Sequence, residues 1–157
     1  MTGQSNVQAL MRGIGPLLEL EQVTEFAGER EWALVVDAAT IVHADYVEAD
    51  DRLMLSMELG QPSAASRHRT YELLLLYNHA WAETGGVRMA PESEGGAVVQ
   101  LFETGAGDLD LAGLRNLVAG FVELARHWRD GIGRGIGTAA AEGGAGFEGM
   151  MPGVIRG

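Results

Sequence analysis

The sequence YELLLLYNHAWAETGG, from Tyr71 to Gly86, places four consecutive leucines in a chain that has 22 acidic and 11 basic residues. On a helical wheel its apolar residues form two opposite faces instead of one stripe. One face holds Tyr71, Leu74, Leu75, Asn78 and Ala82, and the other holds Leu73, Leu76, Tyr77 and Ala80. We therefore expect a helix that starts near Ser66, ends at Gly85-Gly86 and is buried on both faces.

Two surfaces are needed to bury such a helix, and a sheet of the same chain supplies one. The second is either another helix of the chain or a second copy of the protein. Because the other two predicted helices have only one apolar stripe each, we favour a homodimer over burial within the chain. The interface predicted on this helix is formed by Leu73, Leu76, Tyr77 and Ala80.

The segments around this helix predict the rest of the fold. Val7, Leu10, Met11 and Ile14 have helical spacing after a Ser5-Gln8 capping box, and Gly13, Gly15 and Pro16 should end that helix. Strands are expected at 32–37, 40–48, 52–59, 87–90 and 97–103. A last helix, capped by Asp108 or Asp110, carries an apolar stripe that ends at Trp128. The order α-β-β-β-α-β-β-α predicts an α+β fold with an antiparallel twisted sheet packed with helices.

The amino-acid composition limits the classes of protein to which the chain can belong. A chain of 157 residues with 46% hydrophobic content suits one folded domain. It has no cysteine, so disulfides and thiolate metal sites are excluded. A net charge of −11 disfavours binding to nucleic acid and to anionic membranes. The first residues, MTGQSNVQALMRG, lack the basic and apolar regions of a signal peptide, so we expect a cytoplasmic protein without membrane insertion.

The last 27 residues differ from the rest. They contain ten glycines, and their two arginines balance two glutamates, so the net charge lies in the preceding part. Such a segment offers little to bury. We expect a domain over 1–130 and a flexible Gly-rich tail over 131–157.

Three stretches together carry a family resemblance: YELLLLYNHAWAETGGVRMA, AVVQLFE and LDLAGLRNLVAGFVELARHWRDGI. They resemble the type III secretion chaperones of the Tir-chaperone (CesT-like) class in a leucine-rich helix ending near an Asn, a small-residue turn, two strands and a closing helix ending in an aromatic residue. These features correspond to Leu73 to Leu76, Asn78, Gly85-Gly86, Val98 to Phe102, and Phe121 to Trp128. The resemblance covers residues 5–131.

This resemblance implies a homodimeric protein of the bacterial cytoplasm that binds the N-terminal segment of secreted effectors and keeps it soluble and partly unfolded for export. It also makes the secretion-system ATPase a candidate partner. An extended apolar client suits exposed grooves and a sheet edge. The predicted effector-binding residues are Val7, Leu10, Met11, Met54 and Met57, with core packing as the alternative for each. A second hypothesis is a regulatory or sensory domain of the same fold without a secreted client.

Catalysis has weaker support. His43 and Asp45 lie on one face of a predicted strand and could form a base-carboxylate pair or ligate a metal, but no third ligand is evident. His68 and His79 are about three helical turns apart, too far to share a metal. We expect no catalytic residue, no metal and no cofactor. Asn78 is interpreted as a satisfied polar contact.

Overall fold

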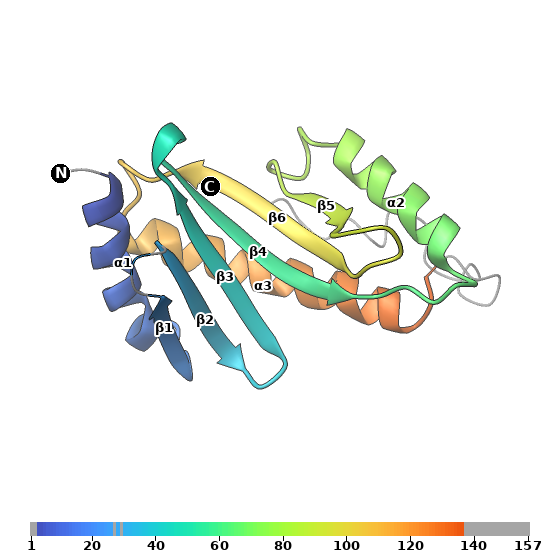
Figure 1. Cartoon of the computed structure of the whole chain (residues 1–157), viewed down its shortest axis with the longest axis horizontal. Coiled ribbons are helices and arrows are strands. Elements are labelled where there is room, and N and C mark those ends of the chain that lie inside the picture. The colour runs from blue at the N-terminus through green and yellow to red at the C-terminus, as the bar shows by residue number, and fades with distance from the viewer. Residues whose placement is uncertain (1–2, 27, 29, 137–157) are drawn as a thin grey trace. The chain divides into compact units, whose positions relative to one another are not determined.

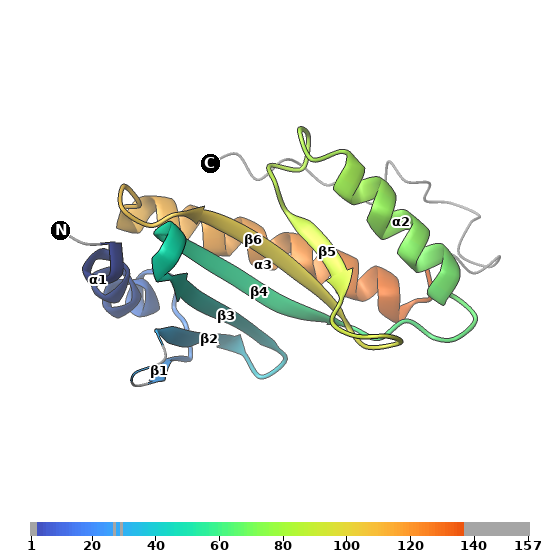
Figure 2. The same ribbon diagram turned by 45° about the horizontal axis from the view of Figure 1, so that its top comes forward.

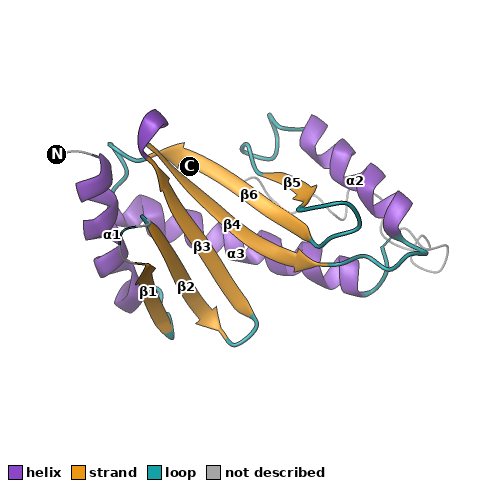
Figure 3. Ribbon diagram, in the orientation of Figure 1, coloured by secondary structure: helices purple, strands orange, loops and turns teal. Residues whose placement is uncertain are grey.

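The computed structural model describes residues 3–26, 28 and 30–136. Figure 1 labels its elements, and Figure 3 shows helices, strands and loops in the same orientation. In chain order they are α1 (Gly3–Leu17), β1 (Gln22–Phe26), β2 (Glu31–Asp37), β3 (Thr40–Val47), a short 3-10 turn η1 (Glu48–Asp50), β4 (Arg52–Gly60), α2 (Arg67–His79), β5 (Arg88–Pro91), β6 (Val98–Gly105) and α3 (Leu111–Gly133).

The strands hydrogen-bond in the order β1-β2-β3-β4-β6-β5. The pairs β1–β2, β2–β3, β3–β4 and β5–β6 are antiparallel. The predicted α+β class with an antiparallel sheet is therefore confirmed, and all five predicted strands are present within two residues of their expected bounds. The described chain divides into two compact units, residues 3–57 with 102–122 and residues 58–101 with 123–136, which are considered in turn.

Strand β1 was not predicted. It pairs with β2, with Val23 opposite Leu34 and Glu25 opposite Trp32, and it adds a fourth strand before α2. Its sequence QVTEF has only two apolar residues, and they do not alternate with the polar ones. An edge strand has few groups to bury, so it leaves a weak periodic signal.

In the first unit, α1 buries the predicted stripe of Val7, Leu10, Met11 and Ile14. The inward residues of the strands are buried as well, as the alternation along β3 and β4 predicts. They include Leu34, Val42, Ala44, Leu53 and Leu55, and the first half of α3 adds Leu114, Val118 and Phe121. Asp110 caps α3, because its Oδ1 accepts a hydrogen bond from the Gly113 amide at 2.6 Å.

The bounds of α1 differ from the prediction at both ends. The helix begins at Gly3, before Ser5, and it continues through Gly13, Gly15 and Pro16 to Leu17. It ends in a Schellman motif: Leu20 N–H donates to Gly15 O at 3.0 Å and Glu19 N–H to Pro16 O at 3.4 Å. Glu19 adopts the left-handed conformation, with φ of 51°. The burial of its apolar stripe therefore outweighs the poor helix propensity of these residues.

In the second unit, α2 ends at His79, earlier than the predicted Gly85-Gly86. Leu73, Leu74 and Tyr77 are buried on it, and the Tyr77 ring packs edge-on against Trp128 of α3, with ring centroids 5.2 Å apart. Burial raises the pKa of Tyr77 to about 12. Asn78 is a satisfied polar contact within the chain, because it bonds the backbone of Met89 in β5.

Helix α3 continues to Gly133, three residues past the predicted boundary at 130, and Ile132 is buried. Most of the predicted Gly-rich tail, residues 137–157, lies outside the described residues. No helix among the described residues is long and apolar enough to cross a membrane.

Candidate functional site

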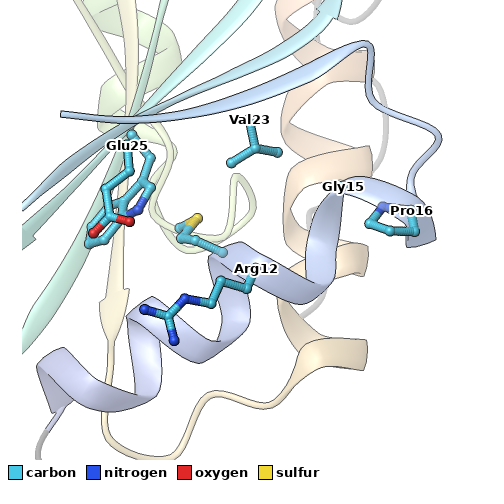
Figure 4. Close-up of a pocket in the computed structure, with 7 residues that line it drawn as sticks. Arg12, Gly15, Pro16, Val23 and Glu25 are labelled. Atoms are coloured by element: carbon cyan, nitrogen blue, oxygen red, sulfur yellow. The ribbon is translucent and has the colours of Figure 1, made fainter. Parts of the chain in front are cut away.

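A pocket of about 300 Å³ opens in the first unit between α1 and the strands β1 and β2. Figure 4 shows the side chains that line it. They come from the second half of α1 and from the two strands: Met11, Arg12, Gly15, Pro16, Val23, Glu25 and Trp32. This volume lies at the lower end of the range for ligand pockets.

The pocket has an apolar floor and a charged rim. Met11 and Trp32 are buried, and Val23 is half-buried beside them. Arg12 and Glu25 are exposed, and no salt bridge joins them in the described structure. Because Gly15 has no side chain, α1 leaves space opposite Val23; a Cβ at Gly15 would lie 3.4 Å from Val23 Cγ2. An apolar side chain can therefore enter while a polar neighbour meets the rim.

Strand β1 forms one border of the sheet, since β2 is its only neighbour among the described strands. Its Val23 and Glu25 face the pocket, whereas Gln22, Thr24 and Phe26 alternate to the other face. An edge strand presents unpaired amide and carbonyl groups that can pair with an added strand. A strand that pairs with β1 would place every second side chain on the pocket side.

Two contacts fix the N-terminal part of α1. Asn6 Nδ2 donates to the carbonyls of Ala106 at 2.7 Å and Leu109 at 2.8 Å. Gly3 lies so close to Asp51 that an added Cβ would be 1.6 Å from Asp51 Oδ1, so a larger residue there would displace the Asp51 carboxylate. Asp51 is itself held by the Tyr46 hydroxyl, which donates to its Oδ1 at 2.8 Å. The wall of the pocket formed by α1 is therefore anchored at one end.

The predicted effector-binding residues are only partly at this pocket. Met11 lines it, but Val7, Leu10 and Met57 are buried in the core. Met54 is half-buried on the opposite face of β4 from Leu53, Leu55 and Met57, as predicted. Spacing alone could not separate a groove from a core on the same helix face. Val23 and Glu25 were missed as site residues because β1 was missed. Trp32 lies in a strand that was predicted, but without β1 nothing marked it as part of a site.

A second surface lies on α2 in the second unit. Of the four predicted interface residues, Leu73 and Tyr77 are buried within the chain, Ala80 is half-buried and Leu76 is 44% exposed. The wheel could not show which direction faces the core. Leu75 is 69% exposed and Trp81 70%, and with Leu76 they form what we call the α2 surface.

His43 and Asp45 lie on one face of β3, as predicted, opposite Ser56 and Met54 of β4. Burial raises the pKa of Asp45, and the charge of His43 partly opposes this. Among the described residues, no group of three His, Cys, Asp or Glu side chains is placed to hold a metal ion.

Comparison with known proteins gives a family and a fold. The family model described as the Tir chaperone protein (CesT) family matches residues 17–129. A chain of the HopA1-SchA chaperone-effector complex has a TM-score of 0.65 at 16% identity, covering 83% of this chain and 98% of its own. No curated protein matches the sequence.

Two further solved structures have the same fold. A chain of the ExsC-ExsE complex has a TM-score of 0.71 at 17% identity, covering 84% of this chain and 97% of its own. A chain of the Yersinia pestis type III secretion chaperone SycH in complex with a fragment of YscM2 has a TM-score of 0.58 at 20% identity, covering 74% and 94%.

Proposed function

Because the chain belongs to the Tir chaperone protein (CesT) family, we propose that it is a type III secretion chaperone. It binds the N-terminal segment of a secreted effector in an extended form and keeps that segment soluble and partly unfolded for export. The observation that carries this proposal is the pocket with an apolar floor beside β1, the edge strand of the described sheet. Solved chains of the same fold include one from a chaperone-effector complex.

The client segment binds by strand addition. Its backbone pairs with the edge of β1, which gives affinity without sequence preference, and alternate side chains face the pocket, which gives selectivity. One aliphatic side chain rests on Met11 and Trp32 and contacts Val23. The net charge of −11 favours basic clients by long-range attraction.

The protein acts as a homodimer through the α2 surface. Leu75, Leu76 and Trp81 are large apolar side chains that are exposed in the single chain. A second copy related by twofold symmetry covers the same three residues on both protomers, so one patch serves both sides of the interface. Leu73 and Tyr77 support the surface from the core of the second unit. The client pocket and the dimer surface lie on different elements.

The protein works in the bacterial cytoplasm, where unfolded effectors await export, and it hands clients to the secretion-system ATPase. Its role is binding without turnover, for which His43 and Asp45 are not required. Conversion of a substrate by the purified protein that is lost in His43→Ala or Asp45→Ala would contradict this part of the proposal.

The test is calorimetric titration with N-terminal fragments of secreted proteins encoded beside its gene. Gly15→Leu fills the pocket from α1, and a Cβ at this position meets Val23 only at ordinary contact distance. We expect an affinity loss of at least tenfold, or about 1.4 kcal/mol. Ala9→Leu is the matched control, because Ala9 is exposed on the same helix.

Equal affinities for the wild type and for a folded Gly15→Leu variant would remove the pocket from the client site. If no secreted protein binds the wild type, the regulatory domain without a secreted client becomes the better hypothesis.

A further inference from the structure

The described chain ends beside α2. After α3, Gly135 has a positive φ of 73°, and its N–H donates to Ile132 O while Ile136 N–H donates to Gly131 O, both at 3.0 Å. This is a Schellman motif, which stops the helix. The carbonyl of Ile136 accepts a hydrogen bond from Thr70 Oγ1 of α2 at 3.3 Å. Since Thr70 is fully buried, residue 137 starts from a fixed point on α2.

The α2 surface lies along the helix from that point. Leu75 and Leu76 follow Thr70 by five and six residues, which is about 8 to 9 Å of helix rise. Trp81 lies two residues beyond the end of α2. Figure 2 shows α2 and β5 from a second direction. All three side chains are exposed among the residues that the structure describes, Leu76 the least. The surface is thus within reach of a short segment that starts at 137.

The sequence after Ile136 has two parts. Residues 137–146, GTAAAEGGAG, contain no large apolar residue and form what we call the linker. Residues 147–155, FEGMMPGVI, form the C-terminal tip and contain Phe147, Met150, Met151, Val154 and Ile155. A Gly-rich linker of this length has an end-to-end distance of roughly 17 Å, which exceeds the span needed along α2.

We propose that the C-terminal tip docks on the α2 surface of its own chain. The large apolar residues of the tail are concentrated in the tip, and Met adapts to irregular apolar surfaces. Residues 137–157 carry two glutamates and one arginine, a net charge of −1, so their repulsion by the acidic remainder of the chain is weak. The tip and a second copy then compete for Leu75, Leu76 and Trp81. The tip thereby sets the protein concentration at which dimers form, a consequence that rests on the dimer described under the proposed function.

The experiment uses the full chain and Trp81 as its probe. Trp32 and Trp128 are buried, so quenching by iodide reports mainly on Trp81. The tip variant carries Phe147→Ser and Met151→Ser. The linker variant carries Ala139→Ser and Ala141→Ser as a matched control. At concentrations where light scattering shows monomers, we expect the quenching constant of the tip variant to be at least twofold higher than those of the wild type and the linker variant.

Sedimentation equilibrium then measures dimerisation. A short linker gives the tip an effective concentration in the millimolar range. We therefore expect the tip variant to dimerise about tenfold more tightly than the wild type. Unchanged quenching in the tip variant would overturn the docking. Dimerisation of the tip variant that is equal to or weaker than that of the wild type would overturn the competition. If all variants stay monomeric, the dimer proposal fails, and the quenching still decides whether the tip docks.

Discussion

The Asn78 side chain pairs with the backbone of Met89 as a neighbouring strand would. Its Nδ2 donates to the Met89 carbonyl at 2.8 Å, and its Oδ1 accepts from the Met89 amide at 2.9 Å. Met89 is buried in β5, so its amide and carbonyl gain both partners from one side chain of α2. This pair joins the end of α2 to the strand that follows it.

Replacing Asn78 should therefore destabilise the fold. Asn78→Ala leaves two buried backbone groups without partners, at a cost of about 1 to 3 kcal/mol each. We expect urea unfolding to show a loss of at least 2 kcal/mol, whereas His79→Ala, at the exposed neighbouring position, changes little. Equal stability of the two variants would show that water replaces the Asn78 contacts.

Alkaline pH should weaken the protein through Tyr77, whose pKa burial raises to about 12 from 10. Between these values the unfolded chain has lost the phenol proton and the folded chain has kept it. The free energy of unfolding is therefore unaffected by this group below pH 10 and falls by roughly 2 to 3 kcal/mol between pH 10 and 12. The chain has no lysine, so tyrosines dominate this range. Tyr77→Phe should flatten the decrease seen in urea unfolding, and an equally steep decrease in that variant would assign it to other groups.

The α2 surface should tolerate charge in the single chain but not in the dimer. Leu75→Asp with Leu76→Asp adds charges at exposed positions, so folding persists, while the interface would have to bury them unpaired. We expect light scattering to show monomers at micromolar concentrations where the wild type is dimeric. The control is Leu17→Asp, at an exposed position on α1, which should leave the dimer intact. A double variant that dimerises normally would place the interface elsewhere.

Truncations before and after residue 136 should differ in their effect on the stability of the fold. Truncation after Asp130 removes the buried Ile132 and the carbonyl that Thr70 contacts, at an expected cost of about 2 to 4 kcal/mol. Truncation after Ile136 keeps both and should lower the melting temperature less than truncation after Asp130. Calorimetry of the two proteins checks this difference, and equal melting temperatures would show that the last turn of α3 contributes nothing.

The sequence predicts most elements because their apolar residues repeat with clear periods. Leu53, Leu55, Met57 and Leu59 alternate along β4, and Leu114, Val118 and Phe121 follow the helical period of α3. The C-terminal end of α2 could not be predicted, because the residues from Ala80 to Thr84 are compatible with both a helix and a turn.

The candidate site was harder to predict for two reasons. β1 has no apolar alternation, so Val23 and Glu25 could not be placed near Met11. Helical spacing also gives the relative directions of side chains but not the direction of the core. Leu73 and Tyr77 therefore looked equivalent to Leu76, although only Leu76 is exposed.

The continuation of α1 through Gly13, Gly15 and Pro16 has a consequence for motion. Glycine and proline are the poorest helix formers, and the Pro16 nitrogen cannot donate to the preceding turn. This last turn consequently has the lowest local stability of the helix, and its amides should exchange with deuterium sooner than those near the anchored Asn6. Because Gly15 and Pro16 also line the pocket, we expect its width to vary with the fraying of this turn. Side chains of different size can thus enter while the core beneath stays closed.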